Sequence, residues 1–156
     1  MRTFKKVKGV PIVYGRKNCQ LGIVTDLTFC APEGRITGYW IQDHRWWSRK
    51  HLLPLSCIQE ETGQHVLVDR KDPFLLRNPS DDRFLHGKNR LLGRSVNQHD
   101  GGMVGIIEDV YFLPNSGKIL GYELTEGLFE DIKKGIKVVK TGQFTVKNDG
   151  ESLVLY

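Results

Sequence analysis

The stretch GIVTDLTFCAPEGRITGYWI at residues 22–41 returns as GIIEDVYFLPNSGKILGYEL at residues 105–124, with the same length and no gap. Eight of the paired positions are identical, namely Gly22/Gly105, Ile23/Ile106, Asp26/Asp109, Phe29/Phe112, Gly34/Gly117, Ile36/Ile119, Gly38/Gly121 and Tyr39/Tyr122. Such dense ungapped agreement indicates an internal repeat, which constrains the fold more than any single motif does.

The agreement extends beyond this stretch on both sides. Upstream, residues 9–22 correspond to residues 93–105, and downstream residues 52–68 correspond to residues 138–155 after a short insertion. Only two copies fit in the chain. A solenoid needs three or more stacked repeats, so two small self-contained units are the better interpretation.

Within each copy the local pattern is typical of β-strands. In GIVTDLTF, Ile23, Leu27 and Phe29 fall on one face, and Asp26 points away from it. The turns APEG and PNSG end in glycines suited to positive φ, which predicts a β-hairpin in each copy. A glycine inside each returning strand, such as Gly38, predicts a bulge or a sharp bend.

Further hairpins are predicted at NCQLG and DGGMVG upstream, and at Thr62-Gly63 and Asp149-Gly150 downstream. The sequence therefore predicts an all-β protein of two small β-barrels in tandem. The first covers residues 1–72 and the second residues 88–156. Residues 73–87 form a linker that is expected to be ordered, because its apolar residues include Phe74 and Phe84.

The ordered combination of these residues resembles the PRC-barrel family, named for the cytoplasmic domain of the photosynthetic reaction-centre H subunit. The first copy matches at Gly9, Pro11, Gly22, Asp26, Phe29, Gly34, Gly38, Leu53-Pro54-Leu55, Gly63 and Val66-Leu67-Val68. The second copy matches at Gly93, Val96, Gly105, Asp109, Phe112, Gly117, Gly121 and Leu153-Val154-Leu155. It departs from the pattern at Lys140-Thr141, where the proline is missing.

This resemblance implies a binding module. The same barrel is similar to the C-terminal domain of a bacterial ribosome maturation factor, which docks on a ribosomal protein, and in the reaction centre it caps a membrane complex. A protein partner is therefore expected first. RNA or the ribosome, and a peripheral membrane complex, are the alternatives. Because fold does not imply function, the partner must be sought in the residues themselves.

Composition favours a soluble cytoplasmic protein. Hydrophobic residues make up 39% and charged residues 26% of the chain, and no apolar run is long enough to predict a transmembrane segment or a signal peptide. The net charge is +5. Residues 1–83 carry fourteen basic and nine acidic side chains, and residues 84–156 carry nine of each, so the whole excess lies in the first half. This excess is the reason to keep RNA as an alternative.

No catalytic residue, metal site or cofactor is predicted. The recurrent Asp26 and Asp109 are expected to bond backbone amides rather than to act in catalysis. The five histidines lack metal-ligand spacing, and a zinc site from His44, His51 and Cys57 is only weakly suggested.

One segment differs sharply between the copies. DHRWWSRKH at residues 43–51 sets two tryptophans among basic residues, whereas the second copy has EGLFEDIKKG at residues 126–135. The predicted partner-binding residues are Arg45, Trp46, Trp47, Arg49 and Lys50. Tryptophan and arginine dominate protein–protein hot spots, and the same side chains can also stack on bases and neutralise phosphates. Alternatively, a tryptophan closes the open end of the barrel.

Overall fold

The structure is a computed structural model that describes residues 1–43, 50–75, 82–98, 100–126, 137–140, 144–146 and 152–155, the last three as backbone. In chain order the elements are β1 (Arg2–Thr3), α1 (Phe4–Val7), β2 (Pro11–Tyr14), β3 (Cys19–Cys30), β4 (Arg35–Gln42), β5 (His51–Pro54), the 3₁₀ helix η1 (Leu55–Cys57), β6 (Ile58–Glu61), β7 (Val66–Val68), β8 (Asp82–Arg83), β9 (Ser95–Gln98), β10 (Met103–Phe112), β11 (Ile119–Thr125), β12 (Lys137–Lys140), β13 (Phe144–Val146) and β14 (Ser152–Leu155). The described chain is mostly β, as the sequence predicts.

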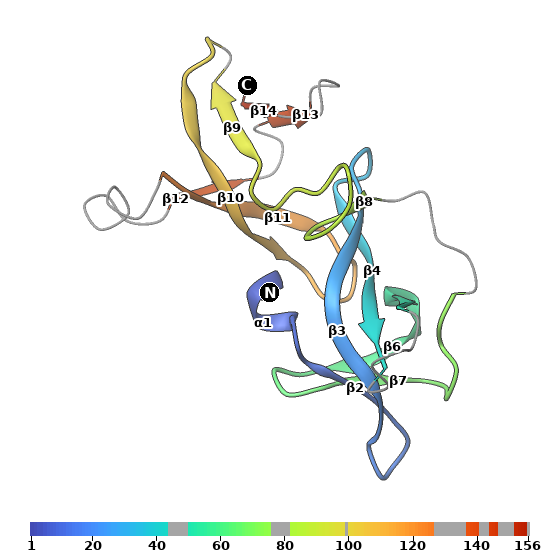
Figure 1. Ribbon diagram of the computed structural model, residues 1–156. Coiled ribbons are helices and arrows are strands. Elements are labelled where there is room, and N and C mark those ends of the chain that lie inside the picture. The colour runs from blue at the N-terminus through green and yellow to red at the C-terminus, as the bar shows by residue number, and fades with distance from the viewer. Residues whose placement is uncertain are drawn as a thin grey trace.

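The repeat builds the same curled sheet twice. The strand order is β5-β4-β3-β2-β7-β6 in the first sheet and β12-β11-β10-β9-β14-β13 in the second, so each strand has a counterpart at the same place. In both sheets one neighbouring pair is parallel, β2 with β7 and β9 with β14. Each sheet curls into a half-barrel (Figure 1).

The alternation predicted for the long central strands is wrong at its first position. A register shift lies between Val24 and Asp26, opposite the Ile41–Trp40 step of β4. The extra residue reverses the side-chain alternation, so Val24 is 1% exposed and Ile23 is 39% exposed. The same shift recurs between Ile107 and Asp109 in β10.

The glycine predictions for the hairpin turns are confirmed. Gly34 has φ +60° and Gly117 has φ +72°, in the left-handed region that favours glycine. Gly38 lies beside a second register shift, between Thr28 and Phe29, so the predicted bulge is present. A Cβ at Gly38 would stand 2.6 Å from the Leu53 carbonyl oxygen, which excludes a larger residue there.

The two halves exchange their leading segments. β1 precedes the first repeat but pairs with β10 of the second sheet, and β8 precedes the second repeat but pairs with β3 of the first. Both pairings are antiparallel, at equivalent places on the two long strands. The repeat therefore extends over β8, which lies within the segment 73–87 that the sequence assigns to the linker.

A shared core joins the halves. Buried residues of both repeats form one hydrophobic cluster, in which Phe4 is 3% and Phe84 is 0% exposed. Their rings meet edge to face with centroids 4.9 Å apart, one ring from each exchanged segment. Tyr39 and Phe112 make a second such contact across the halves, at 6.3 Å. These four buried aromatic rings therefore contribute to the packing between the halves.

The two repeated hairpin turns also meet. The Ile36 amide donates to the Gly117 carbonyl oxygen at 2.8 Å, and the Ile119 amide donates to the Gly34 carbonyl oxygen at 3.0 Å. Each hairpin therefore closes hydrogen bonds for the other. The approach is so close that a Cβ at Gly117 would lie 1.9 Å from the Ile36 carbonyl oxygen.

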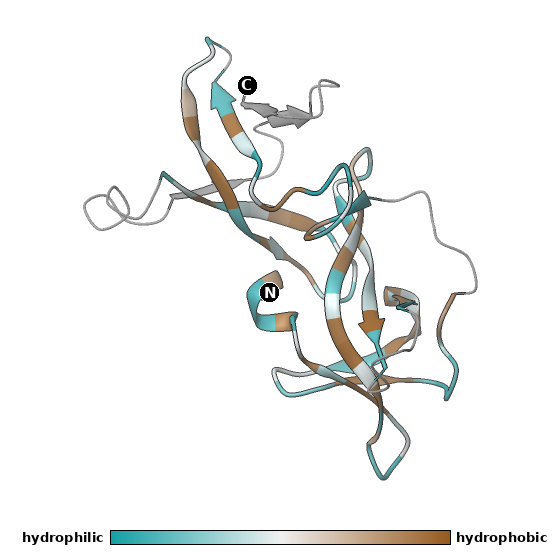
Figure 2. Ribbon diagram, in the orientation of Figure 1, coloured by the Kyte–Doolittle hydropathy of each residue, from teal (hydrophilic) through white to brown (hydrophobic). Residues whose placement is uncertain are grey.

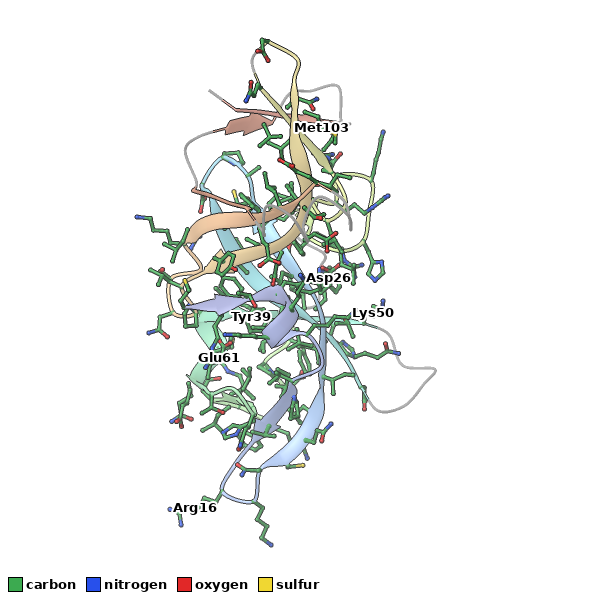
Figure 3. All side chains as sticks on the ribbon, turned by 90° about the vertical axis from the view of Figure 1, so that its left-hand side faces the viewer. Arg16, Asp26, Tyr39, Lys50, Glu61 and Met103 are labelled. Carbon is green, nitrogen blue, oxygen red and sulfur yellow. The ribbon has the colours of Figure 1, made fainter. Side chains whose placement is uncertain are left out.

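The equivalent outer hairpins project in opposite directions. The turn between β2 and β3 lies at the bottom of Figure 1 and the turn between β9 and β10 at the top. In Figure 3, Arg16 lies at the lower tip and Met103 lies in the upper hairpin. Figure 2 shows the hydrophobic colour concentrated along β3 and β10 in the centre. Within the described ranges, no helix is long and apolar enough to cross a bilayer.

Candidate interaction surface

Asp26 fixes the exchanged segment to the first sheet. Its side chain is fully buried, and its carboxylate accepts hydrogen bonds from the amides of Leu27 (2.8 Å), Leu85 (2.8 Å) and His86 (3.1 Å). Arg83 Nε donates a fourth bond, at 3.0 Å, to Oδ2. The prediction that Asp26 bonds backbone amides is confirmed. The amides of residues 85 and 86 belong to the other repeat, so this carboxylate joins the two halves.

Beside Asp26, the Arg83 guanidinium stacks on the Trp40 indole, with Cζ 4.5 Å from the ring centroid. Trp40 pairs with Asp26 across the β3–β4 ladder and is 7% exposed. Trp40 Nε1 and Arg83 Nη2 are buried N–H donors that find no hydrogen-bond partner among the described residues. A buried donor without an acceptor costs about 1–3 kcal/mol, so this half of the molecule carries a local penalty.

Asp109 fixes the other exchanged segment to the second sheet, with different neighbours. It accepts from the amides of Val110 (2.8 Å) and Lys5 (3.3 Å), and Lys5 belongs to the first repeat. Glu123 takes the place of Trp40 in the ladder. Its carboxylate accepts from Lys5 Nζ at 3.0 Å and from the Tyr111 hydroxyl at 2.8 Å. The position equivalent to Trp40 is therefore polar in the second sheet, and Glu123, Lys5 and Tyr111 are all hydrogen-bonded there.

The electrostatics of the second centre follow from this pairing. Burial raises the pKa of Asp109 above its usual range, against the opposing effect of the Val110 and Lys5 amides. Burial alone would lower the pKa of Lys5, but its hydrogen bond to Glu123 and the nearby acidic charges outweigh that effect and raise it. The hydrogen bond to Glu123 raises the pKa of Tyr111. Lys5 therefore stays charged and forms an ion pair with Glu123.

A third polar contact ties the N-terminal arm to the first sheet. The Tyr39 hydroxyl donates to Glu61 Oε2 at 2.9 Å, and Arg2 Nη2 donates to the Glu61 carbonyl oxygen at 3.0 Å. Arg2 Nε also lies 3.5 Å from Glu61 Oε1. Figure 3 shows Tyr39 and Glu61 next to each other. Burial raises the pKa of both Tyr39 and Glu61.

Most of the predicted partner-binding residues lie outside the described residues, namely Arg45, Trp46, Trp47 and Arg49. The fifth, Lys50, is exposed and directly precedes β5. The segment that contains the tryptophans joins β4 to β5. Ile23 pairs with Gln42, the last residue of β4, and its side chain is exposed, so an apolar group lies at the start of this connection.

The weakly suggested zinc site is not assembled by the described part of the chain. His51 instead stacks on Phe74 with ring centroids 5.1 Å apart. Cys57 lies in η1 as a free thiol, and His44 is outside the described residues. No group of three or more His, Cys, Asp or Glu side chains suited to a metal ion occurs among the described residues.

Sequence reasoning predicted that the segment around Phe84 is ordered, but it missed the exchange and the role of Arg83. A signal was present, because Arg2-Thr3-Phe4 and Asp82-Arg83-Phe84 share a phenylalanine at the same distance from the paired strands. Three residues with one identity are too few to extend an alignment. The second copy also has a longer loop between its phenylalanine and the next buried residue, Leu91.

Comparison with known proteins adds little about function. No family model matches the chain. The chain is similar to the uncharacterized protein YrrD of Bacillus subtilis (strain 168), with 26% identity over 156 residues, covering 99% of this chain and 87% of that protein. The resemblance to the PRC-barrel family stays a prediction.

Proposed function

We propose that the chain is a non-catalytic adaptor built from two PRC-type barrels, which docks a protein partner through the β4–β5 connection of its first half. The fold part of this proposal is supported by the identical strand order of the two curled sheets. The repeated aspartates and glycines are used to join the halves, so the function is sought where the copies differ.

The observation that carries the proposal is the contrast between Trp40 and Glu123. These residues occupy equivalent ladder positions, yet one is stacked under Arg83 and the other is ion-paired with Lys5. The first half thus has a buried tryptophan stacked on an arginine at the ladder position where the second half has a carboxylate. Trp46 and Trp47, with their basic neighbours, continue this chemistry a few residues further along the chain.

A large aromatic residue next to an arginine is a typical binding hot spot, worth about 2–4 kcal/mol when buried by a partner. The experiment is affinity capture of partners from the native cell with the full chain, followed by the variants Trp46→Ala and Trp47→Ala. Phe129→Ala, in the corresponding segment of the second copy, is the matched control. We expect a docking tryptophan variant to keep its melting temperature and to lose the captured partner.

Two results would refute this proposal. The first is that both tryptophan variants unfold while Phe129→Ala stays folded, and that capture of the partner persists after charge reversal at Arg45, Arg49 and Lys50. In that case the segment is a plug that closes the first barrel. Capture lost equally in the Phe129→Ala variant would place the docking site outside the first half.

A further inference from the structure

The hydrogen bonds between the two hairpin turns are reciprocal. The Ile36 amide donates to the Gly117 carbonyl oxygen, and the equivalent Ile119 amide donates to the equivalent Gly34 carbonyl oxygen. Each half therefore gives and receives the same hydrogen bond. This reciprocity is the property of an isologous interface, in which two identical subunits present the same surface to each other.

Equivalent residues also meet each other directly. Arg35 and Lys118 occupy the same position of the repeat, and they pair in an isolated antiparallel bridge. Phe4 and Phe84 follow the exchanged strands at the same register, and their ring centroids are 4.9 Å apart. A residue that meets its own counterpart lies next to the axis that relates the two halves. The halves are therefore arranged about an approximate two-fold axis, as the subunits of a symmetric dimer are.

The exchanged segments follow the same symmetry. Asp26 accepts a hydrogen bond from the Leu85 amide at 2.8 Å, and Asp109 accepts one from the Lys5 amide at 3.3 Å. Leu85 and Lys5 each directly follow the phenylalanine of their own exchanged segment. Each half thus presents one carboxylate and supplies one segment. We call these carboxylate contacts, together with the hairpin-turn bonds and the contact between the two phenylalanines, the junction.

The covalent connection between the halves makes its described contacts away from the junction. It joins β7 to β8 and comprises residues 69–81. In its described part, the Leu75 amide donates to the Leu52 carbonyl oxygen at 2.9 Å, and the Phe74 ring stacks on His51. Both contacts stay within the first half. The junction would therefore keep its contacts if this connection joined halves that belong to two different junctions.

We propose that the junction also forms between two copies of this chain. In the resulting closed dimer, the first half of each copy pairs with the second half of the other, which makes two complete junctions. A second copy fits because it presents the same carboxylate, segment and turn at matching places. Monomer and dimer contain the same junction contacts, so the β7–β8 connection decides between them. A flexible connection gives an effective concentration in the millimolar range, which favours the monomer in dilute solution. This proposal does not depend on the adaptor function.

Within one copy, the β7–β8 connection must span most of the length of β3. It starts after β7, which β2 aligns with Cys19 at one end of β3, and it ends before Asp82, which pairs with Phe29 near the other end. Figure 1 shows β7 and β8 at these opposite ends of β3. At about 3.3 Å per residue, the two ends are roughly 25–30 Å apart. Residues 69–81 reach about 45 Å when fully extended, which is enough to span this distance.

The test shortens this connection. A chain that lacks residues 70–79 keeps every junction residue, but its remaining connection reaches only about 15 Å, so its own two halves cannot meet. The matched control replaces residues 70–79 by a Gly/Ser segment of the same length, which removes the same contacts with the first half and keeps the reach. Size-exclusion chromatography with light scattering gives the mass of each chain, and circular dichroism during heating shows whether it is folded.

We expect the shortened chain to be a folded dimer and the Gly/Ser chain to be a folded monomer, both at about 1 µM, far below the effective concentration of a flexible connection. Gly117→Ala should lower the melting temperature of the dimer as well as that of the natural chain, because both contain the same turn contact. The natural chain should also contain dimer after refolding from denaturant at about 1 mM. Tagged and untagged natural chains should form mixed dimers when they are refolded together, but not when the folded chains are mixed.

Several results would overturn the proposal. A folded monomer from the shortened chain would mean that the halves fold without the junction. A shortened chain that is unfolded beside a folded Gly/Ser chain would mean that the junction does not form between copies. A dimer from the Gly/Ser chain, or mixed dimers from folded chains, would assign the association to another surface. If both altered chains are unfolded, the natural chain decides, and a lack of dimer after refolding at about 1 mM then refutes the proposal.

Discussion

Asp26 and Asp109 occupy the same position in two copies of one sheet, and their surroundings are not alike. Both carboxylates hold the amides of a segment that arrives from the other repeat. Around Asp109 the neighbouring Lys5 is exposed and paired with Glu123, whereas around Asp26 a partly buried arginine stacks on a buried tryptophan. The comparison separates what the fold requires, a carboxylate that receives an exchanged segment, from what each half is free to change.

The largest expected effect is on Asp26 itself. Asp26→Ala removes the acceptor of three amides and leaves Arg83 without its carboxylate, so we expect a loss of about 3–5 kcal/mol in the free energy of unfolding. For a chain of this size the melting temperature should fall by about 10 °C or more. Thermal unfolding followed by circular dichroism measures the change.

Asp109→Ala is the matched variant, and it should cost clearly less, about 1–2 kcal/mol. It removes two hydrogen bonds that backbone amides donate to the carboxylate, and Lys5 keeps Glu123 as its partner. Burial also raises the pKa of Asp109, so removing its charge recovers part of the cost. Equal losses in the two variants would show that the Arg83–Asp26 ion pair contributes nothing to the difference between the centres.

The hairpin glycines give the second comparison. Both Gly34 and Gly117 have positive φ, so alanine costs about 1–2 kcal/mol at either position from the backbone alone. A Cβ meets nothing within 4 Å at Gly34, but at Gly117 it would collide with the Ile36 carbonyl oxygen. We expect Gly117→Ala to cost at least twice as much, because it also separates the two hairpin turns.

Chemical denaturation of Gly34→Ala and Gly117→Ala, with a common slope against denaturant, measures the two costs. A lower slope in Gly117→Ala would indicate that the halves no longer unfold together. If the two alanine variants have the same stability, the contact between the hairpin turns is not tight in solution, and the shared core alone joins the halves.

How much of this was readable from the sequence depends on how local each feature is. The hairpin at residues 22–41, its glycine turn and the bulge at Gly38 follow from short-range chemistry, and all were predicted. The bulge at Thr25 was not, because no glycine or proline marks it, and it reverses the exposure of Ile23 and Val24. This single extra residue has no signature in the sequence, but it reverses which face of the sheet the preceding side chains point to.

The exchange was beyond sequence reasoning for a different reason. It pairs residues of opposite repeats, Arg2 with Phe112 and Asp82 with Phe29, over a separation that no periodicity reports. The sequence repeat predicts two equivalent sheets. It is equally compatible with each sheet pairing with the leading strand of its own repeat and with each sheet pairing with the leading strand of the other repeat. The partner-binding residues Arg45, Trp46, Trp47 and Arg49 stay predictions, since the described residues on either side of them end at Asp43 and begin again at Lys50.

The third prediction concerns pH and the contact between Tyr39 and Glu61. Burial raises the pKa of Glu61 above its ordinary value of 4.5, so the folded chain holds this proton more tightly than the unfolded chain does. Stability therefore falls as pH rises from that ordinary value through the raised pKa. Glu61→Gln carries no charge and should escape this fall.

The difference in melting temperature between Glu61→Gln and the natural chain should thus shift in favour of the variant between about pH 4 and pH 7. We expect a shift of a few degrees, measured in matched buffers of constant ionic strength. Glu60→Gln, at the exposed neighbouring position, is the control. A difference that does not change with pH, or that shifts the other way, would mean that the Arg2 ion pair outweighs burial and that the arm is held by charge.

The smallest effect is expected at the ladder position that distinguishes the two halves. Trp40→Phe keeps an aromatic ring under the Arg83 guanidinium and removes the indole Nε1–H, for which the described part of the chain offers no acceptor. Loss of the unpaired donor gains about 1 kcal/mol, and loss of ring size costs a similar amount. The melting temperature should therefore stay within a few degrees of the natural value. Glu123→Gln, at the same position of the second sheet, weakens the Lys5 ion pair and should lower it instead. A marked loss in Trp40→Phe would show that the indole N–H has an acceptor in solution, and the penalty assigned to the first half would then be absent.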